Sequence, residues 1–199
     1  MSTLFNHKAD YILEDKRVLL TPLTPDKLEY LLPFAINEPD TWKFSLVSLK
    51  GIDGMKQYVD TALKAREEGR EYPFIVYDKN SGNYAGSTRF YDIQPKYGTL
   101  QLGYTWYGEH FRGTGLNKHC KFLLLQFAFE ELGMERVEFR ADARNERSIA
   151  AMKSIGCKVE GILRGNVPIE GGGRRDSIIL SILKNEWEHD VKKNLSARL

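Results

Sequence analysis

The chain has 199 residues, of which 42% are hydrophobic and 12% aromatic, so it can bury the core of a domain and is neither disordered nor fibrous. Its 29 basic and 27 acidic side chains nearly cancel, and the charge therefore predicts neither a nucleic-acid nor a membrane partner. No apolar run approaches the roughly 20 residues that span a bilayer, and the N-terminal residues lack a signal-peptide core. We therefore expect a single domain over residues 1–199, located in the cytoplasm.

A strand, two helices and three further strands are predicted in the N-terminal half. The first strand is expected at 17–20, followed by a helix near Thr24, whose hydroxyl is suited to capping the free amides of the first turn. A longer helix is expected at 53–68, because apolar residues recur there every three or four positions and Gly69 follows. Strand-like runs then occupy 72–77, 84–93 and 99–107. Their short, turn-rich connections predict antiparallel hairpins.

The C-terminal half alternates helices with strands. Its strongest helix is predicted at 116–132, where apolar residues form one wide stripe that ends at Gly133. After it we expect a strand at 136–141, a helix at 145–154, strands at 158–163 and 177–183, and a polar helix from about 185. A strand, helix, strand succession after antiparallel hairpins predicts an α+β fold with one parallel strand pair.

The most informative stretch is 104–117, which reads YTWYGEHFRGTGLN. Here a predicted strand enters a glycine-rich turn that opens the strongest helix. Gly113 and Gly115 allow the backbone to approach a ligand, the first helical amides lack partners, and Arg112 adds a positive charge. These features predict an anion site suited to a pyrophosphate, and a tight turn with an ordinary helix start is the alternative. The stretch matches neither the P-loop nor the three-glycine dinucleotide pattern.

The same stretch resembles the cofactor loop of the GCN5-related N-acetyltransferases (GNAT), which is written Q/RxxGxG/A. This sequence supplies HFRGTG at 110–115, with His110 in place of Gln or Arg. A second block, NERSIAAMKSIGCKVEG at 145–161, is similar to the helix and strand that follow in this superfamily and supply an Asn to the pantetheine arm. Within the superfamily, the chain is most similar to the ribosomal-protein N-terminal acetyltransferase (RimJ/RimL-like) group.

The resemblance implies a GNAT-type sheet that is mostly antiparallel, with one splayed parallel strand pair and helices on both faces. The pair would be 99–107 and 136–141, and the gap between them would hold the pantetheine of acetyl-CoA as an added strand. Asn145 would hold that arm. The residues expected to hold the pyrophosphate are Arg112, Gly113, Thr114, Gly115, Leu116 and Asn117.

Three residues are candidates for the chemistry. A backbone amide near Tyr104 would polarise the acetyl carbonyl. Many relatives place a Tyr at the position of Met152 to protonate the sulfur, so the expected sulfur partner here is Ser148, which matches a serine of the RimJ/RimL-like group. A serine hydroxyl is a weak acid, so it would donate a hydrogen bond or relay a proton. Glu109 is a candidate base, unless the neutral amine binds directly and no base is required.

The resemblance also implies that the loop after the first helix receives the acceptor. Trp42 and Glu38 lie there, and Tyr91 on a central strand is expected in the same pocket, although aromatic residues in sheets are also ordinary core. The scattered histidines and two cysteines form no metal-ligand pattern, so no metal is expected. The resemblance thus implies direct acetyl transfer to a primary amine. A noncatalytic acyl-CoA-binding module, an acyltransferase for another acyl group and a homodimeric assembly remain open.

Overall fold

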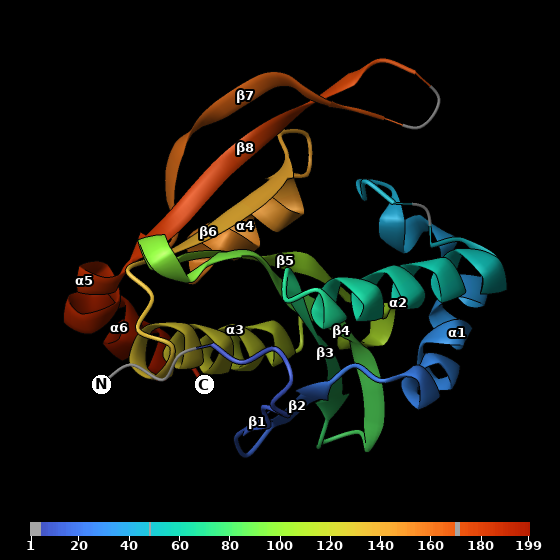
Figure 1. The fold of residues 1–199 in the computed structure, drawn as a ribbon, viewed down its shortest axis with the longest axis horizontal. Helices are drawn as coiled ribbons and strands as arrows, with labels where there is room; N and C mark the ends of the chain where they lie inside the picture. The colour runs from blue at the N-terminus through green and yellow to red at the C-terminus, as the bar shows by residue number, and fades with distance from the viewer. Residues whose placement is uncertain (1–4, 48, 170–171) are drawn as a thin grey trace.

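One eight-stranded sheet forms the centre of the computed structural model, which describes residues 5–47, 49–169 and 172–199. Its strands are β1 Leu13–Glu14, β2 Val18–Pro22, β3 Glu71–Asp78, β4 Asn83–Gln94, β5 Thr99–Tyr107, β6 Arg136–Asp142, β7 Lys158–Pro168 and β8 Arg174–Leu183. Their order across the sheet is β1, β2, β3, β4, β5, β6, β8, β7 (Figure 1). Within the described ranges β5 and β6 pair in parallel, and the other neighbouring strands pair antiparallel. The predicted α+β fold with one parallel pair is confirmed.

Helices of very different length connect and flank the strands. The α-helices are α1 Leu28–Asn37, α2 Gly51–Glu67, α3 Leu116–Gln126, α4 Glu146–Ser154, α5 Lys184–Glu186 and α6 Lys192–Ser196. Short 3-10 turns lie at Pro25–Lys27, Pro39–Trp42, Pro95–Tyr97 and Glu109–Phe111, and π-helical turns at Phe127–Glu131 and Trp187–Val191. Among the helices of these described ranges, none is both long and apolar enough to cross a bilayer.

The two faces of the sheet carry separate apolar clusters. Side chains alternate along a strand, so Phe74 and Val76 of β3 enter one cluster while Ile75 enters the other. The larger cluster joins the sheet to α3 and the C-terminal helices, and the smaller joins it to α1 and α2. The expected stripe of α3 lies in the larger cluster, because Leu116, Cys120 and Leu124 are all buried there. Helices therefore cover both faces.

Two local expectations differ from the structure. The hydroxyl of Thr24 makes no capping hydrogen bond, because the segment opens with the 3-10 turn Pro25–Lys27 and α1 begins only at Leu28. The last two strands also extend well beyond the predicted limits, because Val167 and Pro168 pair with Arg175 and Arg174. Figure 1 shows this β7–β8 hairpin rising away from the rest of the sheet.

The parallel pair separates soon after it begins. β5 and β6 pair only where Thr99, Leu100 and Gln101 face residues 136–138. On its other side β5 carries a bulge, because Ser87 and Arg89 of β4 face Trp106 and Gly103, so that one extra residue lies on β5. Tyr104 in this bulge has a φ of 49°, which is rare for a residue with a side chain. The bulge turns β5 away from β6, and the two strands diverge in Figure 1.

Candidate active site

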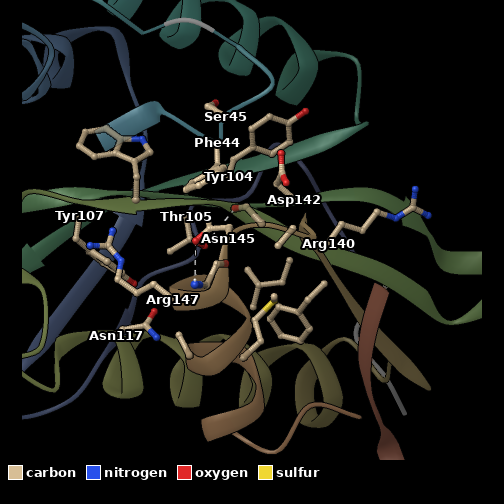
Figure 2. A pocket seen from close by; sticks show the side chains of 18 of the residues that line it. Phe44, Ser45, Tyr104, Thr105, Tyr107, Asn117, Arg140, Asp142, Asn145 and Arg147 are labelled. Carbon is tan, nitrogen blue, oxygen red and sulfur yellow. Dashed lines mark hydrogen bonds between the residues drawn. The ribbon is translucent and has the colours of Figure 1, made fainter. Parts of the chain in front are cut away.

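A cavity of about 720 Å³ opens where β5 and β6 separate. It is lined by residues of both strands, of α3 and α4, and of the segment between α1 and α2. Figure 2 shows Tyr107, Asn117 and Arg147 gathered at one end of it, with Phe44 and Tyr104 further along. The cavity therefore connects the glycine-rich turn to the segment that was expected to receive an acceptor.

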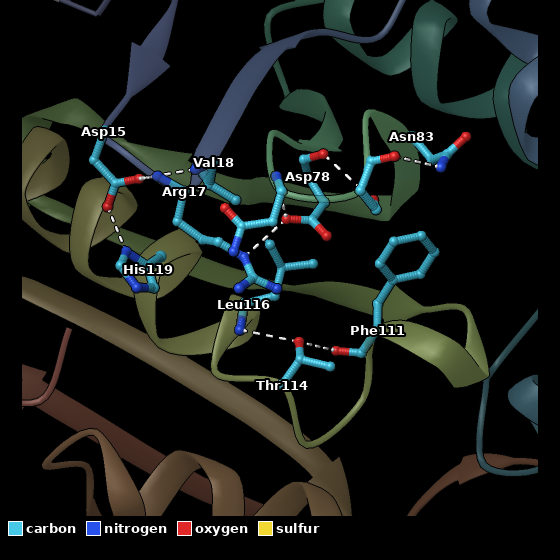
Figure 3. Close-up of polar contacts among 11 residues, drawn as sticks. Asp15, Arg17, Val18, Asp78, Asn83, Phe111, Thr114, Leu116 and His119 are labelled. Carbon is cyan, nitrogen blue, oxygen red and sulfur yellow. Dashed lines mark hydrogen bonds and ion pairs between the residues drawn. The ribbon is translucent and has the colours of Figure 1, made fainter.

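Both glycines of the glycine-rich turn have a backbone conformation that favours glycine. Gly113 and Gly115 have φ values of 75° and 89°, and a Cβ atom at either position would meet nothing within 4 Å, so conformation rather than crowding requires glycine there. Gly115 is the N-cap of α3, and no side chain caps this helix start. The Thr114 hydroxyl donates to the Phe111 carbonyl at 2.9 Å and accepts a long contact from the amide of Leu116 (Figure 3). Residues 113–115 are exposed, and the first amides of a helix lack acceptors within the helix.

The start of α3 is also tied to the edge of the sheet. Asp15, between β1 and β2, lies 2.6 Å from Nδ1 of His119 and accepts the amides of Arg17 and Val18 at 2.8 Å (Figure 3). Burial acts to raise the pKa of Asp15, but these hydrogen bonds outweigh it and hold that pKa below its usual value. The helix that carries the turn is thereby fixed relative to β2.

Arg112 mainly ties the turn to neighbouring elements, and little of its charge is left for a ligand. Its Nε donates to the Tyr107 carbonyl at 2.8 Å, and a terminal nitrogen donates to the Thr41 hydroxyl at 2.5 Å. The carboxylates of Glu38 and Glu109 lie 3.9 and 3.8 Å from it. Burial lowers the pKa of Arg112, and the positive charge of a second arginine, Arg147, lowers it further. The two carboxylates offset the charge of Arg112 at this turn.

Arg147 is a lining residue that the sequence analysis missed. It projects from the first turn of α4 toward the same end of the cavity as Asn117 (Figure 2). It is exposed, and within the described residues it forms no ion pair. The motif NERS contained it, but an arginine on a polar helix face is usually solvated, so the spacing gave no signal.

Asn145 and Ser148 both line the cavity at the start of α4. Asn145 is the N-cap of this helix, where its Oδ1 accepts the amide of Ser148 at 3.1 Å (Figure 2). The backbone amide of Asn145 donates to the Asp142 carbonyl at 2.9 Å. Capping thus uses the side-chain oxygen of Asn145 and leaves its side-chain nitrogen, Nδ2, for another partner. The structure brings both predicted residues to one wall.

The bulge places three aromatic and polar groups together. A Cβ atom on Gly103 would lie 2.9 Å from the Tyr91 ring, so the close approach of that ring requires glycine. The Tyr104 ring packs edge-on to Tyr91 with centroids 5.1 Å apart, and the Arg89 guanidinium lies 4.1 Å from the Tyr104 centroid. Burial raises the pKa of both tyrosines, which therefore stay neutral at ordinary pH.

The expected acceptor residues are distributed unevenly. Trp42 and Tyr91 line the cavity, but Trp42 is only 8% exposed and packs edge-on to Trp106 with centroids 5.4 Å apart, as a core residue does. Glu38 and Glu109 are absent from the described lining. The Glu38 carboxylate accepts the Glu109 amide at 2.9 Å, and the Glu109 side chain is exposed. Both carboxylates lie within 4 Å of Arg112 and outside the described lining.

The cavity also contains a cation that the sequence analysis passed over. Lys121 of α3 is 5% exposed, lines the cavity, and donates from Nζ to the Thr105 hydroxyl at 2.7 Å. The available signal was a lysine adjoining the apolar stripe of the strongest helix, next to Cys120. Arg175 of β8 also lines the cavity and is only 7% exposed. Among the residues that the structure describes, no cluster of three or more metal-ligating side chains occurs.

This combination of a splayed parallel pair, a bulge and a glycine-rich helix start defines the class of protein. The family model described as "Acetyltransferase (GNAT) domain" matches residues 17–158, and the chain belongs to this family of acetyl-transferring enzymes. Over 149 residues it is 30% identical to "Putative ribosomal N-acetyltransferase YdaF" of Bacillus subtilis (strain 168). That alignment covers 75% of this chain and 73% of the relative.

Solved structures agree with this assignment. A GCN5-related N-acetyltransferase from Brucella melitensis has a TM-score of 0.87 at 26% identity, with 96% of this chain and 86% of that chain covered. The structure "Mycobacterium smegmatis RimJ in complex with CoA-disulfide" has a TM-score of 0.76 at 16% identity, with 94% and 93% covered, which is a likeness of fold. The predicted GNAT superfamily and RimJ/RimL-like group are confirmed.

Proposed function

We propose that this chain moves the acetyl group of acetyl-CoA directly to a primary amine while both substrates are bound. The observation that carries the proposal is the continuity of one cavity. It runs from the glycine-rich turn to the segment between α1 and α2. On the way it passes the part of β5 and β6 where the two strands no longer pair with each other. A long, anionic, strand-like molecule and a second reactant fit a site of that form.

The residues present fit acetyl-CoA. The pyrophosphate would lie on the turn from Arg112 to Asn117, where the open conformation of Gly115 would leave main-chain nitrogens accessible. Arg147 would supply a positive charge that no described carboxylate neutralises. The amide nitrogen of Asn145 would hold the pantetheine arm, because the oxygen of that side chain is occupied in capping. Bound there, the cofactor would supply an acetyl thioester.

The protein groups around the reacting carbon have distinct roles in this proposal. The amide of Tyr104, in the bulge, would polarise the acetyl carbonyl, because a bulge frees a backbone donor from the sheet ladder. Ser148 on the opposite wall would donate a hydrogen bond to the sulfur. Glu109 stays a proposed base that would act through a water, although its side chain is exposed and lies outside the described lining.

The acceptor side is a partly apolar pocket. Trp42 would form its floor and Tyr91 its wall. Glu38 would act indirectly, because its hydrogen bond to the Glu109 amide positions the turn. The two acceptor classes that fit are a protein N-terminus and a small-molecule amine. The ribosomal activity in the name of YdaF makes N-terminal peptides of ribosomal proteins the first acceptors to try. Action in the cytoplasm, a single domain over 1–199 and a homodimeric state are also parts of the proposal.

Calorimetric titration with acetyl-CoA tests the cofactor assignment. We expect saturable binding, weakened at least tenfold when Gly115 is replaced by alanine, since the new side chain strains the turn. Absence of heat and of a thermal shift at millimolar acetyl-CoA would contradict the proposal. The matched control is Gly161→Ala on β7, where a Cβ atom also meets nothing within 4 Å and φ is unstrained.

CoA release over a panel of N-terminal peptides and small amines separates the alternatives. A noncatalytic module would bind acetyl-CoA without release above the rate without acceptor. An acyltransferase for another acyl group would prefer propionyl-CoA or succinyl-CoA. One methylene changes binding free energy by only about 1 kcal/mol, whereas a buried charge changes it far more.

A further inference from the structure

Lys121 is a buried cation in the floor of the cavity. Its side chain enters from the middle of α3 and is only 5% exposed, although ammonium groups are almost never buried without a partner. Within the described residues it forms no ion pair, and the thiols of Cys120 and Cys157 are the titratable groups that act on its charge. Burial raises the pKa of each thiol to about 12, so both stay neutral. The fold alone does not balance this charge.

The ammonium lies between the two strands that separate. Nζ donates to the Thr105 hydroxyl of β5 at 2.7 Å and lies 5.7 Å from the centre of the Phe139 ring of β6. The Thr105 hydroxyl is in turn 2.7 Å from the Thr88 hydroxyl of β4, so it has a second partner. Thr105 directly follows Tyr104, whose amide was assigned to the acetyl carbonyl. The cation is therefore next to the bulge, on the line along which a thioester would lie.

The remaining chemistry of the site calls for an acid at this place. When the bond between the carbonyl carbon and sulfur breaks, the electron pair stays on sulfur, and protonation assists its departure. Met152 cannot supply a proton, and the hydroxyl of Ser148 is too weak an acid to do so. Burial lowers the pKa of Lys121 to about 8, close to the usual value of about 8.5 for a thiol, so a proton passes between these groups at little cost.

We propose that Lys121 is the catalytic acid that protonates the sulfur of CoA, while Ser148 only orients it. This inference rests on the proposed function. As the carbon–nitrogen bond forms, the carbon–sulfur bond breaks and its electron pair goes to sulfur, which takes a proton from Nζ. The acylated nitrogen releases one proton to water, and the neutral Nζ recovers one from water. The net products are the amide and the free thiol.

A binding measurement tests the contact without any acceptor. A nearby ammonium stabilises a thiolate, so the thiol of CoA bound to the native protein should ionise at least tenfold more readily than on Lys121→Met. Thiolate absorbance in the ultraviolet, recorded against the complex with desulfo-CoA, gives both titrations. The control is Gln126→Met, on the same helix but bonded to Glu130 at the surface and outside the described lining. It should titrate as the native protein does.

Turnover provides the second measurement, with whichever amine of the panel is accepted. We expect Lys121→Met to lower kcat by roughly 10² or more and to leave the KM for acetyl-CoA within about threefold. The native kcat should fall above about pH 8 as Lys121 loses its proton, and this fall should be absent in the variant. Lys121→Arg keeps the charge but cannot release a proton, so its kcat should stay low.

The outcomes separate this inference from the function on which it rests. A native protein that binds no acetyl-CoA overturns the proposed function. A native protein that binds and transfers, with Lys121→Met within about threefold of its kcat or Lys121→Arg fully active, overturns only the assignment of Lys121. If Lys121→Met fails to fold, the native titration decides, because a bound thiol that ionises as free CoA does shows that no cation faces it.

Discussion

Replacing Lys121 by methionine should stabilise the protein, since the site holds a charge that folding takes out of water. The pKa of this lysine falls from 10.5 to about 8 because its ammonium is buried. At about 1.4 kcal/mol per pKa unit, that fall corresponds to roughly 3 kcal/mol of lost stability. The hydrogen bond to Thr105 offsets about 1 kcal/mol of it. At neutral pH, Lys121→Met should therefore gain roughly 2 kcal/mol in the free energy of unfolding.

The pH dependence gives this prediction a second, signed test. Between about pH 8 and 10.5 the unfolded chain holds a proton on Lys121 that the folded chain has lost, so native stability rises with pH in this window. The penalty is complete below about pH 8 and vanishes above 10.5. Urea unfolding at several pH values should show the advantage of Lys121→Met at neutral pH and its loss toward the upper limit. A destabilised variant, or an advantage independent of pH, would refute the reasoning, and Gln126→Met gives the baseline.

Three further substitutions probe the turn, the cap and the bulge. Gly115→Ala forces a side chain into a left-handed conformation and should lower stability by roughly 1–2 kcal/mol in thermal unfolding, with an unchanged midpoint counting against a strained turn. Asn145→Ala removes the cap on the Ser148 amide and should cost about 1 kcal/mol, whereas Asn145→Asp keeps the cap and should recover most of that loss; equal losses would show that capping is not the role. Gly103→Ala places a methyl group 2.9 Å from the Tyr91 ring and should lower kcat more than it lowers the affinity for acetyl-CoA. Turnover and calorimetric titration measure the two effects, and a larger loss of affinity than of kcat would show that the bulge is unimportant for transfer.

Periodicity predicted most elements because burial and spacing agree in this chain. The stripe from Leu116 to Leu124 and the alternating residues of β3 determine which faces are apolar, and the structure buries those faces. The turn of Gly113 and Gly115 was equally readable, since few residues other than glycine adopt positive φ. Local patterns of this kind place elements without reference to the rest of the fold.

The site was harder to predict because its geometry depends on distant residues. Tyr104 has an unusual φ that no local pattern indicates, and it arises from the mismatch between β4 and β5. Glu38 was expected to meet an acceptor, but the structure pairs its carboxylate with the Glu109 amide, 71 positions away in the chain. Lys121 resembled an ordinary helix residue, and only the packing of α3 beneath the separating strands shows that its charge is enclosed.

The guanidinium of Arg112 makes the two halves of the cavity mechanically dependent on each other. One nitrogen holds the end of β5 through the Tyr107 carbonyl, and another holds Thr41 in the segment that faces the acceptor. A shift of either partner is passed through a rigid planar group to the other. A ligand at the glycine-rich turn that moved this guanidinium would therefore also move Thr41, and such coupling would favour an ordered arrival of the two substrates.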